Sequence, residues 1–320
     1  MEKDTANSNI NPVRILVVGT GAVGGFYGSR LARAGAEVTT VNRSDYKEVA
    51  NNGIFIKSID GDYHFKPHAV LKNVADYQGY PDYILIALKS LPQLDIGKII
   101  APAVGPKTKI FLLQNGINIE ENISVKFLDN EIISGLAFIC VNRIKPGHIS
   151  HLCYGKLVVG AYPDGNSAAV DKLANLFNES KTPCRISESI ITERWRKLIW
   201  NAPFNPISVL TQTDTQQIMA KPETVTLVRT IMEEVYAVAA SVGHILPTDV
   251  IDKNIADTEI MRPYKTSMLL DFEENRPMEV EAILGNIVRT AKKSGIMVPH
   301  LQTMYELLTL LVRGGGQNQK

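Results

Sequence analysis

A lysine and two asparagines recur at intervals of four residues in a stretch that also carries two tryptophans. Lys197, Asn201 and Asn205 therefore lie along one side of a predicted helix. A lysine ammonium in a partly dry cleft can donate a proton near neutral pH, and amides can hold a polar ligand. The spacing predicts a polar row facing a cleft; an ordinary amphipathic helix is the alternative. Pro203 removes one helical hydrogen bond and predicts a kink that could tilt Asn205 toward the cleft.

A glycine-rich turn is the second pattern that could do chemistry, and it consists of Gly19, Thr20, Gly21, Ala22, Val23 and Gly24. It follows the apolar run 15–18, precedes a helical pattern, and is followed by a second strand at 37–41. Gly19 allows a tight turn, Gly21 lets a pyrophosphate approach, and Gly24 lets the helix pack on its strand. This context predicts a dinucleotide-binding turn; a glycine turn without a ligand is the alternative.

The residues after the second strand indicate which dinucleotide binds. In an NAD site, an acidic residue about 20 positions beyond the glycines binds the ribose 2′-hydroxyl. Asn42 and Arg43 stand there instead. A guanidinium fits a 2′-phosphate, which a carboxylate would repel, so NADP is predicted. Asp45 lies nearby, and a plain surface role for Arg43 stays open.

Two further buried strands, predicted at 83–88 and 110–113, end in polar residues. The first leads into Lys89 and Ser90, and the second leads into Gln114, Asn115 and Gly116. Ligands of open parallel sheets bind outside the carboxyl ends of the strands, so Lys89 and Asn115 are expected on the same edge as the glycine turn. Capping of the next helix is the alternative role for them.

The remaining patterns divide the chain near residue 188. Before it we expect a hairpin over 55–65 with an Asp60-Gly61 turn, strands at 132–138, 147–152, 156–160 and 184–186, and a helix over 168–178. After it only helical patterns occur, including 225–242 and 278–293. We therefore predict an α/β protein with disordered tails at 1–12 and 314–320. A Rossmann-type dinucleotide-binding domain spans 13–188, and an all-helical substrate and catalytic domain spans 189–313.

Composition excludes several classes of function. The chain has 320 residues, 45% of them hydrophobic, and a net charge of +1, which gives no electrostatic reason to expect nucleic acid or an anionic membrane. No stretch approaches 18 uncharged apolar residues, and the polar start lacks the apolar core of a secretion signal. A cytoplasmic protein is expected.

The cysteines and histidines suggest no further chemistry. Cys140, Cys153 and Cys184 form no CxxC motif and are odd in number, so free buried thiols in a reducing compartment are expected. His148 and His151 lie in a strand-like pattern without a third ligand nearby, so no metal site is predicted.

Taken together, the ordered motifs resemble the ketopantoate reductase (2-dehydropantoate 2-reductase) family over about residues 14–310. The resemblance is carried by the glycine turn with Tyr27-Gly28, Leu88-Lys89, Gln114-Asn115-Gly116, Trp195-Arg196-Lys197-Leu198 with Asn201 and Asn205-Pro206, Ser267-Met268-Leu269, and Arg276-Pro277-Met278-Glu279. Glu279 stands twelve residues after Ser267.

The resemblance implies reduction of the ketone of 2-dehydropantoate to (R)-pantoate by NADPH, on the route to pantothenate and coenzyme A. It implies that Lys197 is the general acid, that Glu279 is an essential partner of the reacting oxygen, and that Asn201, Asn205 and Ser267 hold the substrate. It also implies a set of residues along the cofactor: Gly19, Gly21, Ala22, Val23, Gly24, Arg43, Lys89 and Asn115. The protein would be a monomer or a homodimer, with a small 2-oxo acid as its partner.

Three positions depart from the family pattern. Glu281 stands where aspartate is frequent, Leu284 where better-studied members carry asparagine, and Pro203 where many relatives have an apolar residue. These departures leave reduction of another 2-oxo acid as an alternative. A β-hydroxyacid dehydrogenase and a non-catalytic NADP-binding regulator are two further alternatives. The Gln114-Asn115-Gly116 cluster and the spacing from Ser267 to Glu279 argue against the dehydrogenase.

Overall fold

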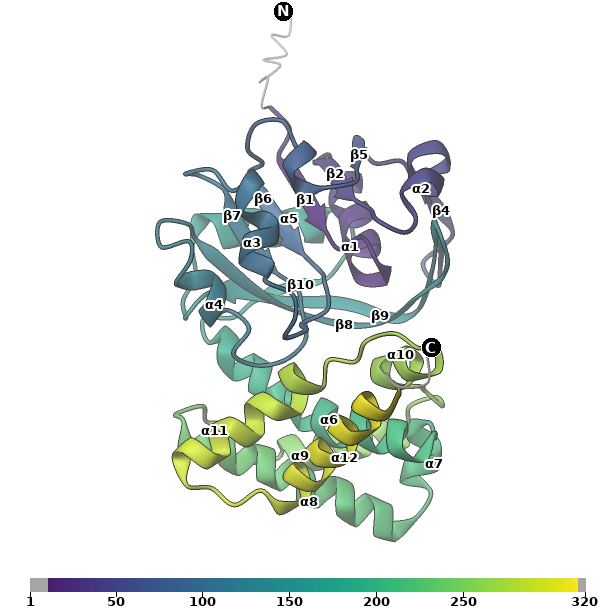
Figure 1. Cartoon of the computed structure of the whole chain (residues 1–320), viewed down its shortest axis with the longest axis vertical. Coiled ribbons are helices and arrows are strands. Elements are labelled where there is room, and N and C mark those ends of the chain that lie inside the picture. The colour runs from purple at the N-terminus through teal and green to yellow at the C-terminus, as the bar shows by residue number, and fades with distance from the viewer. Residues whose placement is uncertain (1–10, 316–320) are drawn as a thin grey trace, which may run out of the picture.

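The chain folds into a sheet-containing part stacked on a helical part, as Figure 1 shows for a computed structural model that describes residues 11–315. The expectation of an α/β fold with an all-helical second part is confirmed. The predicted tails, 1–12 and 314–320, lie almost entirely outside the described residues. At the C-terminal boundary, helix α12 (Pro299–Gly315) extends past residue 313, where the tail was expected to begin.

The first part contains one ten-stranded sheet with the order β4-β3-β9-β8-β7-β6-β1-β2-β5, and β10 pairs with β9. Strands β5, β2, β1, β6, β7 and β8 run parallel in the order that defines the Rossmann fold. Buried β-branched and leucine side chains fill both faces of β1 and β6, as expected of strands covered on two sides. The strands are β1 (Arg14–Val18), β2 (Glu37–Val41), β3 (Ile54–Ser58), β4 (Tyr63–Phe65), β5 (Ala69–Leu71), β6 (Tyr83–Ile86), β7 (Lys109–Leu112), β8 (Ile132–Lys145), β9 (His148–Ala161) and β10 (Cys184–Ile186).

Strands β8 and β9 are longer than the sequence predicted and form the side of the sheet next to the helical part (Figure 1). The two short strands expected at 147–152 and 156–160 are one strand, β9. Its pairing with β8 shifts register after Tyr154, which has a left-handed φ of 62° and pairs with Ile139, because Gly155, with a φ of 120°, is skipped. This irregularity bends the strand without ending it, which is why the pattern was misread as two strands.

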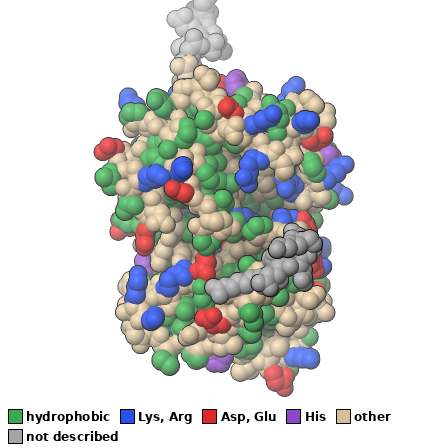
Figure 2. Space-filling view, viewed as in Figure 1, with side chains coloured by type: hydrophobic (Ala, Val, Ile, Leu, Met, Phe, Trp, Pro, Cys, Tyr) green, Lys and Arg blue, Asp and Glu red, His purple; other side chains and the backbone are tan. Residues whose placement is uncertain are grey.

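Short helices connect the strands, and the antiparallel hairpin β3–β4 confirms the predicted Asp60-Gly61 turn. The helices of this part are α1 (Ala22–Arg33), α2 (Tyr46–Asn52), α3 (Ile96–Ile100), α4 (Glu121–Ser124) and α5 (Ala168–Glu179). Acidic and basic side chains both occur over the face shown in Figure 2.

The second part is built around helix α6 (Ile190–Thr211), which continues through both Pro203 and Pro206. Its buried residues pack with those of the other helices into one apolar core. The helix expected over 278–293 begins later, and Glu279 lies in the loop just before it. A π-helical turn, Glu281–Gly285, leads into α11 (Asn286–Ser294). The other helices are α7 (Thr215–Met219), α8 (Pro222–Ser241), α9 (Val250–Glu259) and α10 (Ser267–Glu273).

The expectation of free thiols is wrong for two of the three cysteines. Cys140 on β8 and Cys153 on β9 form a disulfide, and Cys184 is free. Cys140 and Cys153 are 13 residues apart, and it is the antiparallel register of β8 and β9 that places them opposite each other. No helix of residues 11–315 is both long enough and apolar enough to cross a membrane.

Candidate active site

The glycine turn between β1 and α1 has the shape that a dinucleotide requires. Gly19 has a φ of 96°, and a Cβ there would lie 2.6 Å from the Leu88 nitrogen. A Cβ on Gly24 would lie 2.3 Å from the Gly19 oxygen, so α1 can approach β1 only without one. Gly21 instead faces open space, at a helix N-terminus with neither a side-chain cap nor an acidic residue in its first turn. These residues fit a pyrophosphate, and the first part is a dinucleotide-binding domain.

The Lys197 side chain crosses from α6 to the sheet. Its Nζ donates to Asn115 Oδ1 at 2.9 Å and to the Ala137 carbonyl at 2.7 Å, and it lies 5.5 Å from the centre of the Phe138 ring. Burial lowers the pKa of Lys197 to about 8; the nearby Arg194 charge lowers it as well, while the Glu279 carboxylate opposes both. An ammonium has three N–H donors, so these two bonds leave one for a ligand.

Glu279 accepts hydrogen bonds from the loop after β6 and from the loop after β7, close to Lys197. The carboxylate is only 5% exposed; Oε1 accepts from the Ser90 backbone N–H at 2.8 Å and Oε2 from Asn115 Nδ2 at 3.4 Å. Ser90 Oγ also donates to the Asn115 carbonyl at 3.1 Å. Asn115 therefore contacts both Lys197 and Glu279 through its amide, and the three side chains form one connected group.

A cavity of about 1090 Å³ lies between the long strands of the sheet and helices α6 and α9. Among the predicted site residues, those that line it are Val23, Asn115, Lys197, Asn201 and Ser267. Ser267 begins α10, which Thr266 caps by accepting from the Leu269 N–H at 3.1 Å. Four separate elements thus converge on this cavity from sequence positions far apart.

Other predicted residues lie elsewhere. Asn205 is 2% exposed and is not among the cavity's lining residues; its Oδ1 has no hydrogen-bond partner within the described part of the chain. Lys89 forms an ion pair with Asp271 of α10, which Arg276 also contacts at 3.0 Å. Arg43 is exposed after β2, while Asp45 is buried and engaged by Asn42 and Arg143.

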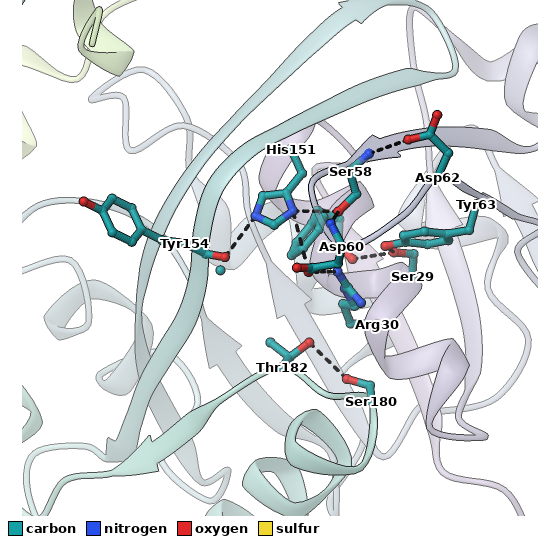
Figure 3. A network of polar contacts seen from close by, with 12 residues as sticks. Ser29, Arg30, Ser58, Asp60, Asp62, Tyr63, His151, Tyr154, Ser180 and Thr182 are labelled. Carbon is teal, nitrogen blue, oxygen red and sulfur yellow. Dashed lines mark hydrogen bonds and ion pairs between the residues drawn. The ribbon is translucent and has the colours of Figure 1, made fainter. Parts of the chain in front are cut away.

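The wall that β9 contributes to the cavity is supported from behind by a polar network (Figure 3). His151 is 2% exposed; its Nε2 lies 3.0 Å from the Tyr154 carbonyl and its Nδ1 lies 2.9 Å from Ser58 Oγ. Burial lowers the pKa of His151, so a neutral ring suits this position. The network holds the irregular turn that carries Tyr154, one of the cavity's lining residues.

Sequence reasoning missed several contributors. Ser90 and Ala137 act through backbone groups that carry no residue-type signal. Arg194 is fully buried although arginine is usually a surface residue, and its position in the motif next to Trp195 was the available clue. Phe138, whose ring faces the ammonium, could be placed only once the register of β8 was known.

A glycine turn on a Rossmann sheet, with a partly buried lysine of the helical part lining the same cavity as Val23, defines a dinucleotide-dependent oxidoreductase. The chain belongs to the ketopantoate reductase family. The family model described as ketopantoate reductase PanE/ApbA matches residues 15–164, and the model of its C-terminal region matches residues 189–312.

Individual relatives agree with this assignment. A 2-dehydropantoate 2-reductase of Nostoc sp. is 35% identical over 307 residues, covering 94% of this chain and 96% of the relative. The crystal structure of 2-dehydropantoate 2-reductase from Methylococcus capsulatus is 48% identical, with a TM-score of 0.88, over 93% of this chain and 96% of that one. A ternary structure of D-mandelate dehydrogenase with NADH and anilino(oxo)acetate, 24% identical, shares the fold with a TM-score of 0.85 over 94% of this chain and 99% of that one.

Proposed function

We propose that the protein reduces the ketone of 2-dehydropantoate to (R)-pantoate with NADPH, on the route to pantothenate and coenzyme A. The observation that carries the proposal is the Lys197 ammonium, which reaches the cavity with a pKa of about 8 and is aimed by Asn115 and the Ala137 carbonyl. Relatives named for this reaction cover nearly the whole chain.

The residues of the cavity account for the proton half of the reaction. When bound, the nicotinamide supplies a hydride to the carbonyl carbon. Negative charge then develops on the carbonyl oxygen, and Lys197 both stabilises it and donates the proton. Glu279, through Asn115, keeps the lysine charged and in place. Asn201 and Ser267 line the cavity and would hold the substrate's polar groups, together with Asn205, which is buried one helical turn beyond Asn201.

The glycine turn would hold the cofactor pyrophosphate, with Lys89 and Asn115 further along it. We propose NADP over NAD because Arg43 is exposed and has no ion-pair partner in residues 11–315, whereas the Asp45 carboxylate is already engaged. Arg43→Ala should raise the KM for NADPH roughly tenfold by removing a charge-assisted contact, and should change the KM for NADH less than twofold. Steady-state kinetics with both cofactors checks this, with Arg33→Ala on α1 as the control. Equal use of both cofactors by the unmodified protein would contradict the assignment.

A depletion assay tests the proposed reaction. Purified protein is incubated with NADPH and a panel of 2-oxo acids, and absorbance at the nicotinamide band is followed. We expect 2-dehydropantoate to give the highest kcat/KM. A higher value for a bulkier 2-oxo acid would favour the second candidate, since Trp200, Met261 and Tyr264 give the cavity a large apolar wall. Oxidation of 3-hydroxy acids alone would favour a β-hydroxyacid dehydrogenase, and binding of NADPH without consumption would favour a regulator.

We further propose that the two domains divide near residue 188 and that the protein is cytoplasmic and either a monomer or a homodimer. Limited proteolysis tests the domain boundary near residue 188, and measurement of the mass in solution tests the oligomeric state.

A further inference from the structure

Arg194 lies one helical turn before Lys197 on α6 and is enclosed by the sheet. The residue is 1% exposed. Its Nη1 donates to the carbonyls of Gln114 at 2.9 Å and Gly116 at 3.2 Å, and its Nε donates to Ser134 Oγ at 2.9 Å. Helix α6 of the helical part thus places a charged side chain between the loop after β7 and strand β8 of the sheet.

Glu120 supplies the matching charge. It is fully buried, forms an ion pair with Arg194, and accepts from Ser134 Oγ at 2.7 Å. A buried carboxylate and guanidinium are costly to desolvate and contribute little net stability, so such a pair calls for a role in geometry. The contacts of this pair indicate what that geometry is.

The two carbonyls that Arg194 Nη1 holds belong to the residues on either side of Asn115. Asn115 Oδ1 is the acceptor for the Lys197 ammonium at 2.9 Å. Arg194 and Lys197 both extend from α6. The guanidinium hydrogen-bonds to the backbone of the 114–116 loop, and the ammonium hydrogen-bonds to the Asn115 side chain of the same loop. A shift of that loop would move Asn115 away from the lysine.

Two charged side chains, Arg194 and Glu279, act on the pKa of Lys197. Arg194 lies on its own helix, and Glu279 comes from the loop before the π-helical turn. From the long strands, Phe138 presents its ring to Lys197, and Lys156 Nζ lies 5.5 Å from the same ring centre. The Arg194 charge lowers the pKa of Lys197, in the same direction as burial. Changing Arg194 should therefore alter both the place and the acidity of the ammonium.

We propose that Arg194, neutralised by Glu120, is a positioning residue that clamps the 114–116 loop so that Asn115 aims the Lys197 ammonium into the cavity. The inference rests on the proposed function of Lys197 as proton donor. It assigns a catalytic effect to a side chain that does not line the cavity.

Two variants distinguish the effect of the Arg194 hydrogen bonds on the 114–116 loop from the effect of the Arg194 charge on Lys197. Arg194→Met combined with Glu120→Gln removes both charges without leaving either one alone. We expect kcat to fall roughly 30-fold, with the Kd for NADPH changed less than twofold, because a displaced donor costs rate rather than cofactor affinity. Arg194→Lys keeps a positive charge but lacks the planar fork of donors that reaches two carbonyls and a hydroxyl from separate nitrogens, and it should lose roughly tenfold in kcat.

The pKa of Lys197, measured by competitive acetylation across pH in the protein without cofactor, is the readout that a merely structural role would not move. It should rise in the double variant, which lacks the Arg194 charge, and stay near that of the unmodified protein in Arg194→Lys. Arg229→Met on α8 is the control: Arg229 is ion-paired to Asp252 at 2.8 Å and is not among the cavity's lining residues. It should leave kcat and the Lys197 pKa unchanged.

A double variant with unchanged kcat and unchanged Lys197 pKa would overturn the inference. If that variant does not fold, Ser134→Ala takes its place: it removes only the bridging hydroxyl and should lower kcat roughly threefold. Unchanged kcat there would overturn the inference equally. If Lys197→Ala is inactive but the Arg194 variants are fully active, the positioning role of Arg194 is refuted and the proposed function stands. If Lys197→Ala is active, the proposed function itself is refuted.

Discussion

Replacing Lys197 by alanine should lower kcat by roughly 100-fold or more while the Kd for NADPH stays nearly unchanged. The ammonium is the positively charged donor that the structure aims into the cavity through Asn115 and Ala137, and alanine leaves the developing oxyanion without it. Single-turnover kinetics and fluorescence titration with NADPH measure the two quantities.

Lys109→Ala serves as the control for this substitution. Lys109 is a partly buried lysine at the start of β7 and is not among the cavity's lining residues. It should retain full activity. Loss of NADPH binding in parallel with kcat in Lys197→Ala would point to a cofactor role for the lysine rather than proton donation.

The pH dependence of reduction follows from the same residue. A general acid must carry its proton, so kcat/KM should be constant at low pH and decline as pH rises through about 8, the pKa of Lys197. An unperturbed lysine would place that decline above pH 10. Steady-state rates from pH 6 to pH 10, in buffers of matched ionic strength, locate the decline.

Glu279→Gln should produce the second large effect, a fall in kcat of roughly 100-fold at pH 8. The glutamine keeps the size of the side chain, but it removes the negative charge that raises the pKa of Lys197. The lysine pKa should therefore fall further, and the decline in kcat/KM should begin at a lower pH than in the unmodified protein. The neutral amide also bonds more weakly to the Ser90 N–H and places a second donor group beside the Asn115 amide.

Glu234→Gln is the matched control for Glu279→Gln. Glu234 is 9% exposed in the helical part, where it accepts from the backbone N–H groups of His300 and Leu301. It should lower Tm without moving the pH profile. A pH profile in Glu279→Gln identical to that of the unmodified protein would show that the carboxylate does not act on the lysine.

The parts of the fold that could be predicted are those with a local physical cause. The glycine turn, the buried parallel strands and the apolar periodicity of α8 each depend on neighbours along the chain, and the structure confirms these elements. The parallel arrangement also predicts that the loops after β6 and β7 lie at the same edge of the sheet. The structure places Asn115, in the loop after β7, among the residues that line the cavity.

The features that escaped prediction depend on long-range pairing. The disulfide between Cys140 and Cys153 follows from the register of β8 and β9, which no local pattern specifies. The helical spacing of its neighbours places Glu279 in a helix, but Pro277 disfavours a helical conformation at Arg276, and residues 276–279 are not helical. Asn205 shares the helical side of Lys197 and Asn201, yet it is covered by the helical core, which spacing alone could not reveal.

The proposed proton donor is assembled from both parts of the chain: α6 carries the ammonium, while its two acceptors come from the loop after β7 and from β8. Neither fragment produced by cutting between residues 186 and 190 would hold a complete donor. Regained turnover on mixing two such fragments would therefore report their reassembly, giving the enzyme a use as a split reporter.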